Sequence, residues 1–136
     1  MKVYLIRHGT TPGNLEKRYV GTTDEPLTKD AVTALKKLRV RYPIPVQVVT
    51  SPLKRCMQTA SLLFPGIPSE CCDGLKECDF GRFEYHNYME LSQDAEYQRW
   101  IDSNGTLPFP GGESQKSFQE RCCRAFLESV AALRQA

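Results

Sequence analysis

The sequence has no long apolar run, little net charge and only two histidines. Its first apolar run, Val3–Ile6, stops at Arg7, so it is too short for the core of a signal peptide. No later segment approaches the length of a membrane span. A net charge of +2 is also too small for the basic stripe of a nucleic-acid-binding surface. We therefore expect a cytoplasmic protein with no membrane contact and no nucleic-acid partner.

Metal-binding and disulfide patterns are missing as well. No cysteine pair has C-x-x-C spacing, and no histidine lies at ligand spacing from a cysteine. We expect free, mostly buried thiols in a reducing compartment. No metal and no cofactor is expected. The six cysteines are Cys56, Cys71, Cys72, Cys78, Cys122 and Cys123.

The chain has the size and apolar content of one globular domain. It holds 136 residues, 40% of them hydrophobic, which is enough to build a core. We expect a single domain over residues 1–136. A strand over Val3–Ile6 is followed by a long polar loop over residues 10–25, and loops of this kind often carry function.

Helix and strand signals alternate in the middle of the chain. Thr28 predicts a helix N-cap, and apolar residues at three-to-four spacing continue to Tyr42, before Pro43 ends the helix. Val46–Thr50 reads as a buried strand, and residues 69–72 as a short edge strand.

Another helix is expected directly after the Val46–Thr50 strand. Ser51 is its expected N-cap, with Pro52 at the first helical position. We expect Arg55 to point away from the buried face of this helix, one turn after the strand ends. The buried face should comprise Leu53, Met57, Ala60, Leu63 and Phe64.

The C-terminal half predicts a small helical cap and a last long helix. Residues 84–112 read as a cap insertion with helices over 88–91 and 95–102, and the last helix starts near Glu113. Its expected core face is Phe118, Cys122, Ala125, Phe126, Val130 and Leu133.

This order of elements predicts an α/β fold with a mostly parallel sheet joined by right-handed crossovers. Ligands of such sheets bind beyond the carboxyl ends of the strands. His8 and the helix that carries Arg55 should therefore meet at one rim of the sheet.

The residue types at this rim suit phosphoryl transfer. A neutral histidine such as His8 can attack phosphorus with one ring nitrogen while the other donates to a backbone carbonyl. Arg7 and Arg55 are permanently charged forks for phosphate, and Asn14 adds a neutral donor. Glu77, flanked by apolar residues, is the candidate general acid for the leaving oxygen.

Five sequence blocks resemble the histidine phosphatase superfamily, whose fold is phosphoglycerate mutase-like with three α/β/α layers. Within the superfamily, the stretches F-G-R-F-E-Y-H-N-Y-M-E-L and D-A-E-Y-Q-R-W are most similar to α-ribazole phosphatases of the cobalamin pathway. The five blocks are R-H-G-T-T-P-G-N, G-T-T-D-E-P-L-T, S-P-L-K-R-C-M-Q-T-A, L-K-E-C-D-F-G-R-F-E and F-P-G-G-E-S.

The resemblance implies a role for each candidate residue. It implies a phosphohistidine at His8, proton donation by Glu77, and phosphate held by Arg7, Asn14 and Arg55 with backbone help near Gly21. Glu84 is the second candidate acid, although helix capping or pairing with a lysine is the more ordinary reading. Glu113 and Ser114 match a family block, and a helix N-terminus explains them equally well.

One part of the family pattern is not found. The family's second histidine lies on a strand that follows the last helix, and the only other histidine here is His86, expected to be a cap residue. We expect a truncated chain whose C-terminal strands are missing. Loss of one preorganised donor typically costs about a hundred- to a thousandfold in turnover.

These observations leave several functions open. The first is a cofactor-independent phosphomonoesterase acting on a small phosphorylated metabolite, with α-ribazole 5′-phosphate favoured. The alternatives are a phosphoglycerate mutase and a catalytically impaired phosphate-binding protein. Cap geometry should set the substrate, and the oligomeric state, with a homodimer as one alternative, does not follow from the sequence.

Overall fold

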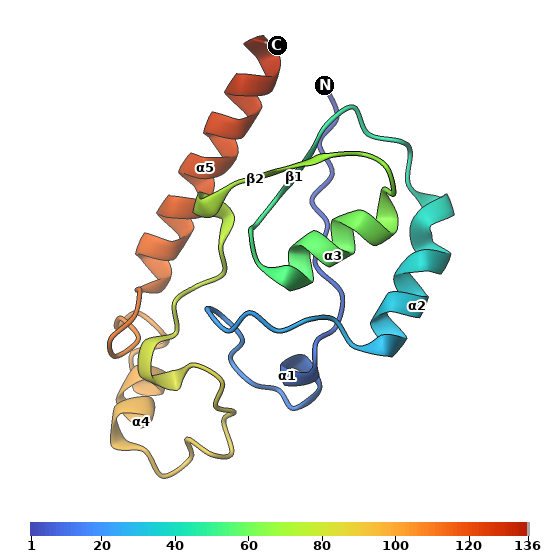
Figure 1. Cartoon of the computed structure of the whole chain (residues 1–136). Coiled ribbons are helices and arrows are strands. Elements are labelled where there is room, and N and C mark those ends of the chain that lie inside the picture. The colour runs from blue at the N-terminus through green and yellow to red at the C-terminus, as the bar shows by residue number, and fades with distance from the viewer. Residues whose placement is uncertain (136) are drawn as a thin grey trace.

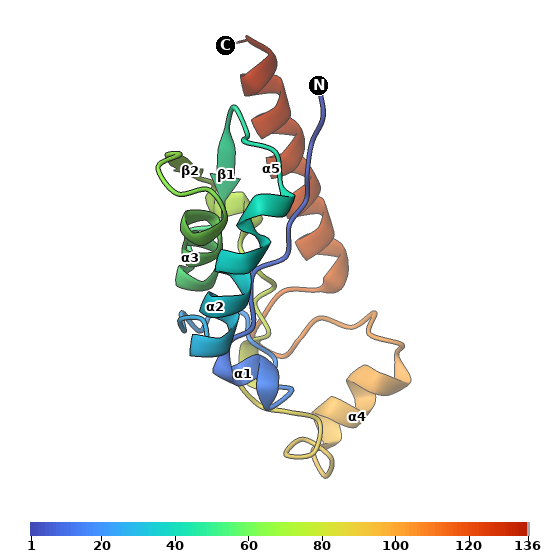
Figure 2. The ribbon, with the colours of Figure 1, turned by 90° about the vertical axis from the view of Figure 1, so that its right-hand side faces the viewer.

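The computed structural model describes residues 1–135 and has an α/β fold built on a small parallel sheet. β1 (Val48–Thr50) pairs in parallel with β2 (Ser69–Cys71), with Val48 opposite Ser69. The sheet lies between helices: α2 and α3 on one side and α5 on the other (Figures 1 and 2). The helices are α1 (Pro12–Leu15), α2 (Lys29–Leu38), α3 (Lys54–Leu63), α4 (Ala95–Asp102) and α5 (Gln115–Gln135), with 3-10 turns η1 (Arg39–Arg41), η2 (Asp73–Leu75) and η3 (Gly81–Phe83).

The predicted first strand does not form. Residues 1–10 have no strand assignment and run as an extended segment past α2 and α5 (Figure 2). Val3, Tyr4 and Leu5 are exposed, and within residues 1–135 this segment has no ladder of hydrogen bonds to β1 or β2. The prediction of a strand over Val3–Ile6 is wrong because apolar, β-branched residues form a strand only beside a pairing partner.

The N-terminus of α2 was predicted correctly, but that of α3 was not. Thr28 accepts a hydrogen bond from Ala31 N, as an N-cap does. α3 begins at Lys54 rather than at Pro52, and Ser51 does not cap it. Asp24, from the long loop, accepts the Lys54 N–H at 2.7 Å. Asp24 of the loop therefore takes the place of Ser51, the predicted cap.

The buried face of α3 also differs from the prediction. The buried residues of the helix are Arg55, Thr59 and Leu63, at spacings of four, whereas Met57 is 40% exposed. The expectation that Arg55 points away from the core is wrong. Its guanidinium finds enough backbone acceptors inside to compensate for burial.

The cap is held by an aromatic cluster. The expected helix over residues 88–91 is replaced by turns, whereas α4 forms and is capped by Asp94, which accepts the Tyr97 N–H. Phe83 is fully buried, and its ring meets Tyr97 edge-on at a centroid distance of 5.2 Å. The buried members of the cluster are Cys78, Phe83, Leu91, Tyr97 and Phe109.

The last helix uses the face that the sequence predicts. Ala125 is buried, and the other five residues of that face are partly buried. A Cβ atom on Gly74 would lie 2.5 Å from Ala125 Cβ, so a glycine is needed where η2 packs against α5.

No helix within residues 1–135 is long and apolar enough to cross a bilayer. All six cysteines are free, but of these only Cys78 is buried, so the expectation of mostly buried thiols is wrong.

Candidate active site

His8 lies half-buried where the extended N-terminal segment turns toward α1. Its Nδ1 lies 2.6 Å from the carbonyl oxygen of Gly9. Because a carbonyl only accepts, Nδ1 carries the proton in the neutral ring and Nε2 keeps its lone pair. Burial lowers the pKa of His8 below its usual 6.5, and the charges of Arg55 and Arg7 lower it further, against the Gly9 hydrogen bond and the charge of Glu77.

Arg55 is the most deeply buried charged residue of the site, with 1% of its surface exposed. Nη1 donates to Thr23 O at 2.8 Å, and Nη2 donates to Gly21 O at 2.9 Å. Nε is buried and has no hydrogen-bond partner in the described structure. A buried cation with an unused N–H is expected to bind an acceptor, since leaving such a group unpaired costs free energy.

Thr59 connects the His8 turn to α3. Its hydroxyl donates to Arg55 O at 2.7 Å and accepts the Gly9 N–H at 3.0 Å. Gly9 is thus fixed through its N–H, while its carbonyl orients the His8 ring. One threonine therefore links the histidine to the helix that carries Arg55, a role that the sequence analysis missed.

Asn14 is oriented by a capping box at the start of α1. Its Oδ1 accepts the Thr11 N–H at 2.9 Å, and Thr11 Oγ1 accepts the Asn14 N–H. With Oδ1 used in this way, the other end of the amide is a donor, which has the polarity that an anion requires. Arg7, in contrast, is exposed.

Gly21 is surrounded by protein groups. Its N–H donates to both oxygens of Glu84, at 3.0 and 3.2 Å, and its carbonyl accepts from Arg55. A Cβ atom here would clash with the carbonyl of Cys78. A direct backbone contact between Gly21 and phosphate stays a prediction. In the structure, Gly21 links Glu84 to Arg55 through its N–H and its carbonyl.

Glu84 forms neither the helix cap nor the lysine pair expected for it. Its carboxylate accepts N–H groups of Gly21, Thr22 and Thr23, and also the Thr23 hydroxyl at 2.6 Å. These donors come from a loop about 60 residues earlier in the chain, and only the fold brings them together. Glu84 therefore fixes the loop whose carbonyls accept from Arg55.

Glu77 lies at the edge of a cleft of about 320 Å³ between the loop of residues 21–22 and α5. Its Oε1 accepts the N–H of Cys78 at 2.8 Å. The charge of Glu77 acts on the pKa of His8, which places both residues in one electrostatic environment. The cleft is lined by Gly21, Thr22, Leu53, Asp73, Lys76, Glu77, Asp79, Glu113 and Arg121.

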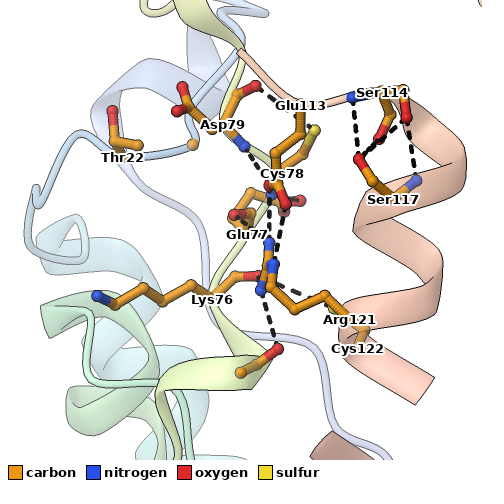
Figure 3. Close-up of polar contacts among 12 residues, drawn as sticks. Thr22, Lys76, Glu77, Cys78, Asp79, Glu113, Ser114, Ser117, Arg121 and Cys122 are labelled. Atoms are coloured by element: carbon orange, nitrogen blue, oxygen red, sulfur yellow. Dashed lines mark hydrogen bonds and ion pairs between the residues drawn. The ribbon is translucent and has the colours of Figure 1, made fainter. Parts of the chain in front are cut away.

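Two residues of the last sequence block have separate structural tasks. Ser114 Oγ accepts the Ser117 N–H at 3.0 Å and so caps α5, as expected. Glu113 instead forms an ion pair with Arg121, at 2.8 Å between Oε1 and Nη2 (Figure 3).

His86 is exposed in the cap, with Nδ1 at 3.0 Å from Glu84 O. Within residues 1–135, no three His, Cys, Asp or Glu side chains converge on a metal site.

The family model of the histidine phosphatase superfamily, branch 1, matches residues 3–136. The chain belongs to this superfamily. Histidine phosphatases that resemble it include a probable phosphoglycerate mutase, GpmB, from Escherichia coli, which is 33% identical over 99% of this chain. This chain spans 65% of the length of that relative.

Solved structures of histidine phosphatases share the fold. The α-ribazole phosphatase of Shigella flexneri has a TM-score of 0.84 and 26% identity, over 96% of this chain and 67% of its own. A phosphoglycerate mutase from Thermus thermophilus has a TM-score of 0.74 and 34% identity, over 90% of this chain and 68% of its own. The phosphoglycerate mutase-like α/β fold expected from the sequence is thus confirmed.

Proposed function

We propose that the chain carries the active site of a phosphomonoesterase that works through a phosphohistidine at His8. The observation that carries this proposal is the state of the His8 ring. Its Nδ1 donates to Gly9 O, and burial and two nearby arginines lower its pKa, so Nε2 holds a lone pair at neutral pH. A histidine in this state is ready to act as a nucleophile.

The first step moves the phosphoryl group from substrate to His8. Arg7, Asn14 and Arg55 hold the phosphoryl oxygens, with the unpartnered Nε of Arg55 as a buried donor. Nε2 forms a bond to phosphorus as the P–O bond to the leaving group breaks. Glu77 gives its proton to the departing oxygen, which leaves as an alcohol.

The second step returns the site to its starting state. Water attacks the phosphohistidine, the P–N bond breaks, and Glu77 takes a proton from the water. Phosphate leaves, and Nε2 regains its lone pair. Positive charge comes from arginines, so these steps use no metal ion.

The charges of the cleft support a neutral, hydroxyl-bearing leaving group. Four carboxylates and two cations line it, and each cation has a carboxylate partner: Lys76 with Asp73 at 3.8 Å, and Arg121 with Glu113. Asp79 has no cation partner among the residues that line the cleft, and neither lining cation is free to bind a second anionic group. This favours a nucleoside-like phosphate such as α-ribazole 5′-phosphate over a substrate with its own carboxylate.

A phosphoglycerate mutase is the second candidate, because relatives with that name are 33–34% identical to this chain. A mutase would return the phosphoryl group from His8 to another hydroxyl of the substrate. Incubation with labelled 3-phosphoglycerate separates the two functions, since label in 2-phosphoglycerate indicates a mutase and label in inorganic phosphate indicates a phosphatase.

The test of the proposal is the covalent intermediate itself. Rapid quenching with labelled substrate should trap acid-labile, base-stable phosphate on the chain, and His8→Ala should abolish it together with turnover. His86→Ala is the matched control and should keep both. Turnover that survives in His8→Ala would exclude the proposed mechanism.

A further inference from the structure

We propose that Arg121, held by Glu113, is a positioning residue that sets the place of Glu77 at the edge of the cleft. The inference rests on the proposed function, because the position of Glu77 affects turnover only if Glu77 protonates the leaving oxygen. Neither residue of the ion pair would touch the phosphoryl group. Figure 3 shows how the pair lies beside the segment that carries Glu77.

Glu77 needs such support because it lies in irregular backbone. η2 ends at Leu75 and η3 begins at Gly81, so no helix or strand fixes the residues between them. Among the described residues, 1–135, the Glu77 side chain is hydrogen-bonded only to the N–H of its neighbour Cys78. The place of the carboxyl group therefore follows from the path of the backbone.

Arg121 fixes that path from α5. Its Nη1 donates to Gly74 O at 2.8 Å and to Lys76 O at 3.0 Å, and its Nη2 donates to Glu77 O at 3.2 Å. The two carbonyls on either side of the Glu77 Cα are thus held by one guanidinium. A shift of this backbone would have to break charge-assisted hydrogen bonds.

The guanidinium has no donor left for a substrate. Nε donates to Glu113 Oε2 at 2.9 Å and Nη2 to Glu113 Oε1 at 2.8 Å, in addition to the three carbonyl contacts. A guanidinium has five N–H groups, and here five hydrogen bonds use them. Arg121 lines the cleft, yet its bonding is that of a positioning residue and not of a phosphate ligand.

Glu113 is itself anchored beyond Glu77. Its Oε1 accepts the Asp79 N–H at 3.0 Å, and its own N–H donates to Asp79 O at 2.9 Å. The pair therefore holds the segment on both sides of Glu77. The Arg121 hydrogen bond lowers the pKa of Glu113, so the carboxylate stays charged into the acidic range.

Arg121→Lys tests the inference by the choice of leaving group. Lysine keeps the charge but cannot reproduce the planar fork. With β-glycerophosphate, whose leaving alcohol needs a proton, the rate of phosphohistidine formation, measured by rapid quenching, should fall by about ten- to a hundredfold, because a misplaced general acid loses most of its effect. With 2,4-dinitrophenyl phosphate, whose leaving group departs without a proton, the rate of phosphohistidine formation should change by less than about twofold, although the later attack of water, which also uses Glu77, should slow. KM should stay the same for both substrates.

Two further variants show whether Arg121 acts through Glu77. Glu77→Gln removes the acid, and Arg121→Lys added to it should cause no further loss with β-glycerophosphate. Glu113→Gln, which keeps the size of the side chain, should reproduce the leaving-group pattern of Arg121→Lys. Arg124→Lys, at an exposed position on the same helix, is the matched control and should be fully active.

The outcomes separate this inference from the proposed function. An equal loss in the rate of phosphohistidine formation with both substrates, or an additive loss in the Glu77→Gln background, overturns the positioning role while leaving a phosphohistidine on His8 intact. If the unmodified chain forms no phosphohistidine with either substrate, the proposed function fails, and the inference fails with it.

Discussion

Arg55 reaches from the buried face of α3 to the carbonyls of residues 20–23, and Arg121 reaches from α5 to the carbonyls of residues 74–77. Each arginine thus ties a helix to a loop on one side of the candidate site. The two differ in what remains free: the buried Nε of Arg55 has no hydrogen-bond partner among residues 1–135, whereas Arg121 uses every N–H. The comparison separates a residue that can bind a substrate from one that can only hold the fold.

The two arginines also differ in whether a carboxylate neutralises their charge. Arg55 has no carboxylate partner within 4 Å among residues 1–135, whereas Arg121 forms a bidentate ion pair with Glu113. A buried cation without a counter-ion favours binding of an anion, because the anion supplies the missing charge. On the side of the site that carries Arg55, the phosphoryl side, the buried cation therefore favours an anionic ligand. On the side that carries Glu77 and Arg121, the acid side, Glu113 already neutralises the cation.

The largest expected effect comes from the cluster behind the acid side. Cys78 and Phe80, which follow Glu77, pack in the aromatic cluster around the fully buried Phe83. Phe83→Ala should lower the free energy of unfolding by about 4 kcal/mol, as large-to-small substitutions in cores do. Urea unfolding measures this, with Tyr88→Ala, at an exposed cap position, as the control. A loss below about 1 kcal/mol would show that the acid side does not depend on this cluster.

Arg55→Met comes next and acts on the phosphoryl side. It leaves the carbonyls of Gly21 and Thr23 without their donor, which should cost about 3 kcal/mol of unfolding free energy. The pKa of His8 should rise, because the charge of Arg55 lowers it. Lys54→Met, at the exposed neighbouring position, should change neither urea unfolding nor the NMR titration of His8. If the pKa of His8 is the same in Arg55→Met, the charge of Arg55 does not act on the imidazole.

Most of the fold could be predicted from periodicity and capping. Thr28, α4 and the inner face of α5 were predicted from local spacing, because each depends on residues close in sequence. The strand predicted over Val46–Thr50 is shorter, since β1 begins at Val48, and Val46 is exposed. The same reasoning predicted a strand over residues 3–6, which does not form. A strand needs a neighbour, and its pattern alone does not tell whether that neighbour is in place.

The site could be predicted as residue types but not as contacts. His8, Arg55 and Glu77 were chosen for their chemistry, and the structure brings their charges close enough to affect His8. The inward direction of Arg55 was missed because its acceptors are backbone carbonyls more than 30 residues away. The bonds of Glu84 to residues 21–23 and of Arg121 to residues 74–77 are equally nonlocal, and no spacing rule reports them.

Thr59→Val has a smaller effect and tests the link between His8 and α3. Valine keeps the shape but removes the hydroxyl that accepts the Gly9 N–H. We expect a loss of about 1–2 kcal/mol in urea unfolding, since a half-buried donor loses its partner. Thr33→Val is the matched control, because its hydroxyl bonds back to Lys29 O on the exposed face of α2. Equal losses in the two variants would mean that the Gly9 bond contributes nothing of its own.

The smallest expected effect is that of Arg7→Gln. Arg7 is exposed, so its removal should leave stability at neutral pH unchanged, but its charge lowers the pKa of His8. The pKa of His8 should therefore rise, by less than in Arg55→Met, because Arg55 lowers it more strongly. NMR titration of the imidazole measures both shifts.

The same shift predicts a pH dependence of stability, with a definite sign. Because the pKa of His8 is lower in the folded chain than its usual 6.5, the unfolded chain binds the proton more tightly. Stability should fall as the pH drops from 6.5 toward the folded pKa, and this contribution should level off below it. Arg7→Gln should narrow the pH range over which stability falls, because it brings the folded pKa of His8 closer to 6.5. Arg41→Gln, at another exposed arginine, is the control and should leave this range unchanged. A His8 titration unaffected by Arg7→Gln would mean that burial and Arg55 alone keep the ring neutral, and the free N–H and charge of Arg55 would then define the phosphoryl side by themselves.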